Sequence, residues 1–103
     1  MKYLLMYNPV SGRSTVKKKL PEIIKIFKQN EIDLDIYESK EKNDLERYAL
    51  EKASSYDVFL VCGGDGTINE VVNGVMKSDI RPNIAIIPCG TANDIAAILG
   101  IPK

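Results

Sequence analysis

The segment 58–76 constrains the fold more than any other part of the sequence, because a short apolar run leads through glycines into an apolar-striped helix. The uninterrupted apolar run at 58–61 is typical of a parallel strand that is covered on both faces. The glycines within 63–66 allow positive φ and let a ligand approach the backbone N–H groups closely. Thr67 and Glu70 have the spacing of a capping box, which predicts that the helix begins at Thr67. A strand, turn and helix in this order direct unpaired N–H groups and a positive dipole end toward one point, and that point suits a phosphate.

Strand and helix patterns alternate along the whole of the 103-residue chain. Strands are predicted at 3–7, 32–37, 58–62 and 84–87, and helices at 16–27, 43–53, 67–76 and 95–99. The strand at 32–37 alternates apolar with polar residues, so it is expected near an edge of the sheet. The order of elements predicts one α/β domain: an open parallel sheet with helices on both faces, in three α/β/α layers.

The helical patterns carry further local predictions. Pro21 lies inside the first of them, where it should either kink the helix or begin a new one. Asn30 is expected to end that helix, and Asn43 with Glu46 repeats the capping-box spacing before the second. The apolar stripes predict two inward faces, made by Val16, Leu20, Ile23, Ile24 and Phe27 in the first helix and by Ile68, Val71, Val72, Val75 and Met76 in the third.

Composition excludes several classes of function. The 14 basic and 14 acidic residues balance, so the net charge does not indicate a nucleic-acid partner. The chain has no histidine and its two cysteines lack metal-ligand spacing, which excludes zinc chemistry, histidine acid–base catalysis and a disulfide scaffold. Cys62 and Cys89 are interpreted as small buried apolar side chains, with a redox role as the weaker alternative. The lysines at 17–19 are interpreted as a solvated helix face, with attraction to anionic lipid as their alternative.

The sequence also lacks the segments that direct a chain into or across a membrane. No apolar run approaches the roughly 20 residues of a membrane span. The apolar stretch within residues 1–9 is too short for a signal peptide. These features favour a cytoplasmic protein.

Three polar, glycine-bearing turns follow predicted strands, at 8–12, 63–67 and 88–94. The carboxyl ends of parallel strands share one edge of a sheet, and ligands of open α/β sheets bind there. The three turns are therefore expected to meet in one site. In the third turn, Thr91 and Asp94 again have capping-box spacing, and Gly100 is placed to end the last helix.

Asp65 is the most informative residue of the central turn. At about 4 Å and intermediate dielectric, a carboxylate beside a phosphate costs several kcal/mol. Its presence therefore indicates either a Mg²⁺ between the two groups or a hydroxyl or water that donates to the carboxylate. The alternative is a turn aspartate that caps its own backbone. Capping alone accounts for Glu70, and the sequence leaves open whether Asn69 and Asn73 face the site or solvent.

Three motifs in combination resemble the diacylglycerol kinase family of lipid kinases. GGDGT at 63–67 is similar to the signature shared by diacylglycerol kinases, sphingosine kinases, NAD kinases and phosphofructokinases. The longer GGDGTINEVVNG at 63–74, with IPCGTANDIA at 87–96 and YNPVSG at 7–12, looks like the diacylglycerol kinase branch. The resemblance covers the whole chain and implies a phosphofructokinase-like N-terminal domain that binds ATP and Mg²⁺.

The resemblance also implies a set of ATP-binding residues, in which Ser39 stands where such kinases commonly have threonine. That set comprises Asn8, Pro9, Ser11, Gly12, Ser39, Gly63, Gly64, Asp65, Gly66, Thr67, Asn69, Glu70, Gly90 and Thr91. In the same scheme Asp65 is the catalytic residue and the Mg²⁺ ligand, either directly or through a water molecule.

Lipid kinases of this kind have a second, β-rich domain that holds the lipid cleft, the general base and a structural metal site. None of these can be assigned within this chain, which is expected to be the ATP-binding half of an enzyme that phosphorylates a lipid hydroxyl. On its own this half should be inactive and should self-associate through the surface that the second domain covers. The resemblance implies that its partners are ATP and, through the second domain, a lipid substrate, with contact at the membrane surface as a further expectation. A NAD kinase-like enzyme and a non-catalytic nucleotide-sensing module are the alternatives.

Overall fold

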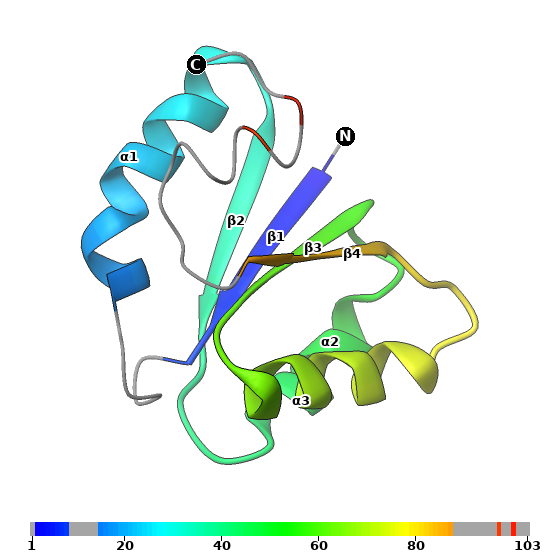
Figure 1. The fold of residues 1–103 in the computed structure, drawn as a ribbon. Helices are drawn as coiled ribbons and strands as arrows, with labels where there is room; N and C mark the ends of the chain where they lie inside the picture. The colour runs from blue at the N-terminus through cyan, green and yellow to red at the C-terminus, as the bar shows by residue number, and fades with distance from the viewer. Residues whose placement is uncertain (1, 9–14, 88–96, 98–99, 101–103) are drawn as a thin grey trace.

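The structure is a computed structural model that describes residues 2–8 and 15–87, together with Ala97 and Gly100. It contains a four-stranded parallel sheet in the order β2-β1-β3-β4 (Figure 1). The strands are β1 (Lys2–Tyr7), β2 (Asp33–Glu38), β3 (Val58–Cys62) and β4 (Asn83–Ile87), and the helices are α1 (Thr15–Gln29), α2 (Asp44–Lys52) and α3 (Asp65–Met76). The predicted α/β architecture is confirmed, whereas the turn expected at 88–94 and the helix expected at 95–99 lie outside the described residues.

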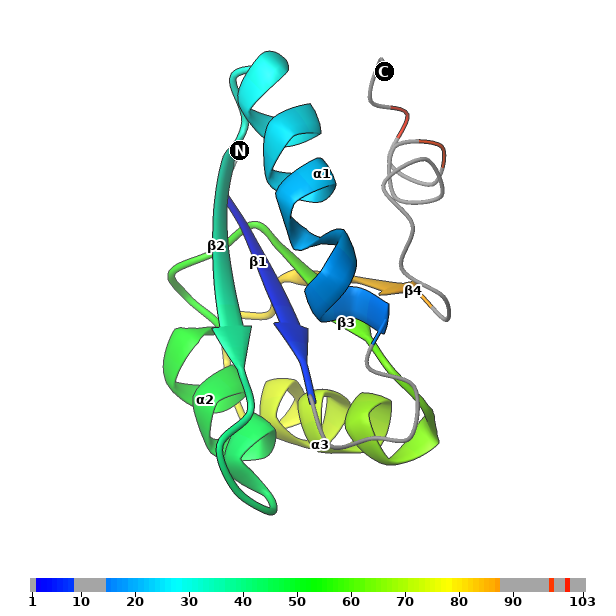
Figure 2. The ribbon, with the colours of Figure 1, turned by 90° about the vertical axis from the view of Figure 1, so that its left-hand side faces the viewer.

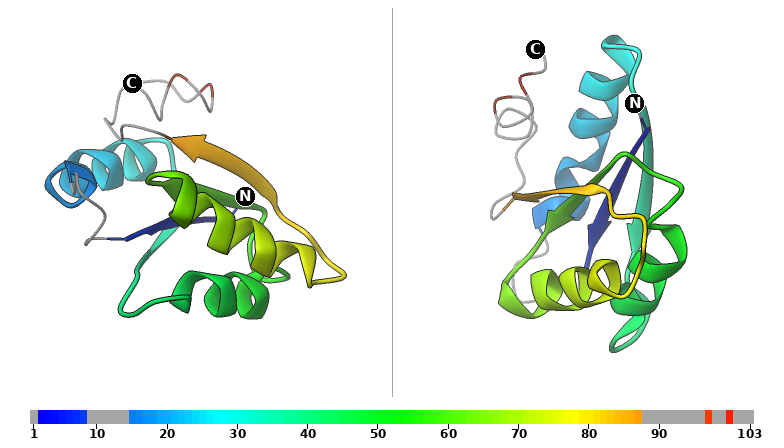
Figure 3. Two further views of the ribbon diagram at one scale, coloured as in Figure 1. Left: turned by 60° about the horizontal axis from the view of Figure 1, so that its bottom comes forward. Right: turned by 90° about the vertical axis from the view of Figure 1, so that its right-hand side faces the viewer.

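The strand order explains why helices cover both faces of the sheet. The chain steps from β1 to β2 in one direction, then crosses back past β1 to reach β3 and β4. Since crossovers between parallel strands are right-handed, α1 must cover one face and α2 and α3 the other. Figures 1 and 2 show this arrangement, and both views in Figure 3 show α2 and α3 side by side.

Two hydrophobic cores lie on opposite faces of the sheet. The central strands β1 and β3 contribute alternate residues to each core, which accounts for their unbroken apolar runs. The core under α1 contains Tyr3, Leu5, Tyr7, Ile23, Phe27, Val58, Leu60, Cys62 and Ile87. The core under α2 and α3 contains Leu4, Met6, Leu45, Ala49, Phe59, Val61, Val71 and Val75. Strand β2 is an edge strand with exposed Asp33 and Asp35, as its alternating pattern predicts.

Helix α1 passes through Pro21 as one continuous helix, so of the predicted alternatives a new helix at this residue is wrong. Asn30 ends it as expected, because both its backbone N–H and its side-chain amide donate to the Ile26 carbonyl. The side chain of Val16 lies outside the described part of the chain, and among the other predicted inward residues one differs. Ile24 is 46% exposed, and Ile26 packs against the core in its place, beside the fully buried Ile23.

The predicted capping box at the start of α2 is wrong. Asn43 is the N-cap but has a left-handed φ of 64° and makes no side-chain capping bond. The next residue, Asp44, is buried and takes over the polar role, accepting hydrogen bonds from Tyr37 Oη at 2.6 Å and from the Lys40 N–H at 2.9 Å. Arg47 Nη2 also donates to Asp44, at 2.8 Å. The Asp44 carboxylate therefore fixes the loop between β2 and α2.

Replacing Asp44 with Asn should destabilise the fold by about 1–3 kcal/mol at neutral pH, since the amide leaves buried partners unsatisfied. Burial alone would raise the pKa of Asp44, but its hydrogen bonds from Tyr37 and Lys40 and the charge of Arg47 outweigh it and lower the pKa. The charged Asp44 carboxylate therefore stabilises the fold fully above the pKa of about 3.9 that it has in the unfolded chain. This stabilisation is lost as pH falls through the lower pKa that Asp44 has in the folded protein.

Urea unfolding at pH 7 and at low pH tests this expectation. The stability gap between wild type and Asp44→Asn should narrow as pH falls, whereas Asp33→Asn, at an exposed carboxylate of β2, should show no such gap. A gap that stays constant across this range would show that the charge of Asp44 is not the stabilising feature.

Helix α3 begins two residues earlier than predicted, at Asp65, with Gly64 as its N-cap. The capping box of Thr67 and Glu70 is therefore wrong, since neither residue occupies the position that such a box needs. The early start is possible because Gly63 has a φ of 148°, which turns the chain sharply after β3. A Cβ on Gly63 would lie 2.9 Å from Thr67 Oγ1, so the turn and the first helical turn are packed tightly.

The inward face of α3 is set by its contact with α2. Of the predicted stripe, Val71 and Val75 are buried, Ile68 and Val72 are partly buried, and Met76 is 57% exposed, contrary to prediction. Gly74 is buried instead, and a Cβ there would lie only 2.2 Å from the Glu46 carbonyl oxygen of α2. This close approach turns the helix so that Met76 faces outward.

Candidate functional site

The carboxyl ends of β1, β2 and β3 meet at one rim of the sheet. Tyr7 is paired with both Glu38 and Cys62, so the residues that follow these strands are neighbours. The Ser39 N–H donates to the Tyr7 carbonyl at 2.9 Å, which carries this pairing one residue further. Since the chain leaves β1 in one direction and reaches β3 in the other, the point between them is where α/β sheets bind ligands.

The structure brings together the predicted site residues that it describes on this rim. Asn8 follows β1, Ser39 follows β2, and the turn 63–67 follows β3. The end of β4 is also at this rim, because Ile87 pairs with Cys62. The remaining predicted ligands lie outside the described residues: Pro9, Ser11, Gly12, Gly90 and Thr91.

The N-terminus of α3 is an electropositive feature of this rim. The first intrahelical bond runs from the Ile68 N–H to the Gly64 carbonyl at 3.1 Å, so the amides of the preceding turn have no acceptor within the helix. Gly64 and Gly66 are exposed, and apart from their chain neighbours and the backbone of α3 no atom of the described residues lies within 4 Å of where their Cβ atoms would be. A ligand can therefore reach these amides and the positive end of the helix dipole.

Asp65 is exposed on the first turn of α3. Its carboxylate makes no hydrogen bond to the backbone within the described ranges, and α3 has no side-chain cap. The alternative reading, in which Asp65 caps its own turn, thus gains no support. Among the described residues there is also no group of three or more potential metal ligands. Asp65 could contribute one carboxylate to a metal ion whose other ligands are phosphate and water.

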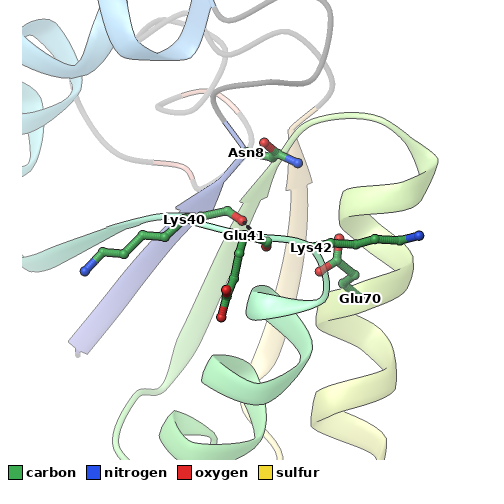
Figure 4. A pocket seen from close by; sticks show the side chains of 6 residues that line it. Asn8, Lys40, Glu41, Lys42 and Glu70 are labelled. Atoms are coloured by element: carbon green, nitrogen blue, oxygen red, sulfur yellow. Dashed lines mark hydrogen bonds between the residues drawn. The ribbon is translucent and has the colours of Figure 1, made fainter.

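A pocket of about 270 Å³ lies between the end of β1, the loop that follows β2 and Glu70 of α3 (Figure 4), and no residue of the turn 63–67 lines it. It is lined by Asn8, Ser39, Lys40, Glu41, Lys42 and Glu70. One wall is the loop between β2 and α2, which the hydrogen bonds of Asp44 hold in place. The buried Ser39 hydroxyl also donates to the Glu41 carbonyl at 3.2 Å within this loop.

Glu70 forms the opposite wall of the pocket, and it is not a capping residue. Its Oε1 atom is buried without a hydrogen-bond partner in the described part of the chain. In Figure 4 the Glu70 side chain points from α3 toward the loop that carries Lys42. A buried acceptor without a donor is costly for the protein alone and points to a ligand that supplies the donor.

Sequence reasoning missed residues 40–42, which line the pocket, although they follow the end of β2 directly. The rule that ligands bind beyond strand ends could have found them. Asn69 and Asn73 are both exposed, and neither lines the pocket. Cys62 is buried, and burial raises the pKa of its thiol to about 12, which fits the buried apolar reading and disfavours a reactive thiolate.

Residues 2–103 match the family described as the diacylglycerol kinase catalytic domain. The chain is 42% identical over 100 residues to a diacylglycerol kinase of Bacillus subtilis, covering 96% of this chain and 33% of that protein. It is 35% identical over 99 residues to a diacylglycerol kinase of Staphylococcus saprophyticus, covering 95% of this chain and 32% of that protein. The chain thus spans about a third of the length of these relatives.

The fold is similar to a crystal structure of a diacylglycerol kinase from Bacillus anthracis, with a TM-score of 0.73 and 41% sequence identity. That similarity covers 98% of this chain and 38% of the other. Within residues 2–8 and 15–87, no helix is both long enough and apolar enough to cross a bilayer.

Proposed function

Because this chain belongs to the diacylglycerol kinase catalytic domain family, we propose that it is the nucleotide-binding part of a lipid kinase. The enzyme would transfer the γ-phosphoryl group of ATP to a lipid hydroxyl, such as that of a diacylglycerol. The observation that carries this proposal is the meeting of Asn8, Ser39 and the turn 63–67 at one rim, beside the N-terminus of α3. The family match favours this activity over a NAD kinase.

In this proposal the backbone does most of the nucleotide binding. The amides of the first turn of α3 would hold the phosphates, because the glycines there leave them accessible and the helix dipole favours negative charge. Asn8 and Ser39 would fix the rest of the nucleotide at the ends of β1 and β2. Phosphoryl transfer depends mainly on such positioning and on charge neutralisation.

The residues present fit a Mg²⁺ ion bound together with the nucleotide. Asp65 offers an exposed carboxylate on the same turn as the phosphate-binding amides. Mg²⁺ usually binds through one or two carboxylates together with substrate phosphates, so a single aspartate suffices. When bound, the ion neutralises charge on the phosphates, and Asp65 would hold it in place. The lipid, the general base and contact with the membrane surface would involve the two thirds of the relatives that this chain does not span.

The isolated chain should therefore bind Mg·ATP weakly and phosphorylate no lipid. At a ligand concentration ten times Kd, binding should stabilise the fold by about 1.4 kcal/mol, which thermal unfolding detects. Adenosine, which lacks phosphates, should give no comparable shift. Radiolabelled ATP with diacylglycerol in detergent micelles measures the transfer, and turnover by the chain alone would contradict the division of labour proposed here.

A further inference from the structure

The two edges of the sheet differ in their chemistry. Strands β2 and β4 each have one neighbour among the described strands, so each presents an open edge (Figure 1). We propose that the edge of β4 is a docking surface for a further β-strand, contributed by the part of the full-length protein that this chain does not span. The chain covers only 33% and 32% of the two relatives named above, so proteins of this family contain ample sequence for such a strand.

The backbone of β4 has hydrogen-bonding groups that face away from the sheet. The Asn83 N–H donates to the Asp57 carbonyl at 3.0 Å, so Asn83 directs its backbone groups toward β3. In a parallel ladder this direction alternates from residue to residue, and Ile84 and Ile86 therefore point their N–H and C=O groups outward. No described strand lies beyond β4 to pair with these groups. They are available for the ladder of one more strand.

Side chains protect the edge of β2 but not that of β4. An open edge can pair with another segment, and proteins commonly prevent this with charged side chains on the strand. Strand β2 has exposed Asp33 and Asp35. Strand β4 has the sequence NIAII, without a charge or a proline. The chemistry of β2 thus suits an edge that stays in water, whereas that of β4 suits an edge that another strand covers.

An apolar surface accompanies the open edge on its α3 side. Ile84 packs against the core under α2 and α3, and Ile86, two residues on, faces the same way but is 46% exposed. Val72 and Met76 lie on the far side of α3 from Gly74, where α3 contacts α2, so this flank faces the margin of the sheet at β4. Met76 is 57% exposed there. A docked strand with apolar side chains on this face would remove Ile86 from water.

The length of β4 favours a segment of the same protein over a second copy of the chain. Strand β4 has five residues, so two such edges could form only a short ladder. Joining two separate molecules also costs translational and rotational freedom, which a short ladder offsets poorly. A strand in the same polypeptide avoids most of that cost.

Amide exchange at single-residue resolution tests the docking by comparing the isolated chain with a full-length protein that carries it. The Ile84 and Ile86 amides should exchange at least about tenfold more slowly in the full-length protein, because a paired amide exchanges only when its strand opens. The Leu34 amide of β2 is the internal control. It also points outward, since the Ser39 N–H donates to the Tyr7 carbonyl, and should exchange at the same rate in both proteins.

A matched pair of variants tests whether the apolar surface is covered. Ile86→Lys and Ile24→Lys suit the comparison because both isoleucines are 46% exposed and only Ile86 lies on β4. In the isolated chain both variants should unfold near the wild-type temperature. In the full-length protein Ile86→Lys should lower the Tm by about 4 °C or more, since docking would bury its charge. Ile24→Lys should leave that Tm nearly unchanged.

Three results would overturn this inference. One is equal exchange of the Ile84 and Ile86 amides in the two proteins, and another is a full-length Ile86→Lys protein as stable as Ile24→Lys. Slow exchange in the isolated chain that disappears on dilution would assign the edge to a second copy and also overturn it. None of these measurements involves a nucleotide, so their failure would leave the proposed function standing, and the reverse also holds.

Discussion

In a full-length kinase that carries this domain, replacing Asp65 with Asn should lower turnover by at least about 100-fold, a loss of roughly 2.7 kcal/mol in the transition state. The amide keeps the size of the side chain but removes the charge that would hold Mg²⁺ against the phosphates. Asp65 is exposed and makes no hydrogen bond to the described backbone, so the fold should lose less than about 1 kcal/mol from the helix dipole.

Steady-state assays and urea unfolding on the same preparations separate the two effects. In the isolated chain, the variant should also lose the Mg²⁺-dependent part of ATP binding. Asp79→Asn is the matched control, because it makes the same chemical change at an exposed site beyond the far end of α3. If Asp65→Asn turned over substrate at the wild-type rate, the prediction would be wrong and Asp65 would be a turn aspartate without a role in catalysis.

Replacing Gly74 with Ala should destabilise the fold by about 2 kcal/mol or more, since overpacking typically costs 1–3 kcal/mol and sometimes exceeds it. The added methyl group would lie 2.2 Å from the Glu46 carbonyl oxygen and 3.0 Å from the Ala49 Cβ. A carbonyl oxygen in the helix backbone cannot move aside without shifting α2. The substitution would normally favour a helix by about 1 kcal/mol, so a loss shows that packing dominates.

For a domain of about this size, 2 kcal/mol corresponds to a fall in Tm of roughly 8–16 °C. Gly66→Ala is the control, because it lies in the same helix and, outside the helix's own backbone, no atom of the described part of the chain is within 4 Å of the new methyl group. Its Tm should stay near that of wild type or rise. A Gly74→Ala protein as stable as wild type would mean that α2 and α3 do not approach each other this closely in solution.

The layout of the rim could be predicted from the sequence because it follows from chain order and strand direction alone. Apolar runs end at Tyr7 and Cys62, parallel strands place both ends on one edge, and glycines after the second end leave room for a ligand. The edge position of β2 also followed from its alternating residues. These are statements about backbone direction, which local sequence specifies well.

The predictions that were wrong concern side chains whose roles depend on tertiary contacts. Thr67 has a capping-box spacing with Glu70, yet the φ of Gly63 starts the helix earlier and frees Glu70 for the pocket wall. The sequence predicts a side-chain cap at Asn43, but the polar contacts at this helix start are made by Asp44. Its carboxylate accepts hydrogen bonds from Tyr37 Oη and the Lys40 N–H, which lie across the loop. Met76 fits the apolar stripe, but the contact at Gly74 turns it outward. A spacing rule contains no information about such partners.

The central position of β1 and β3 has a consequence for how this molecule moves. Both strands are covered on two faces and flanked on two sides, so their amides should be among the last to exchange with deuterated water, after those of β2 and β4 at the margins. Asn8 and Gly63 directly follow these two slowest segments. Local opening can therefore spread through the outer strands while the proposed anchor points for the nucleotide keep their spacing.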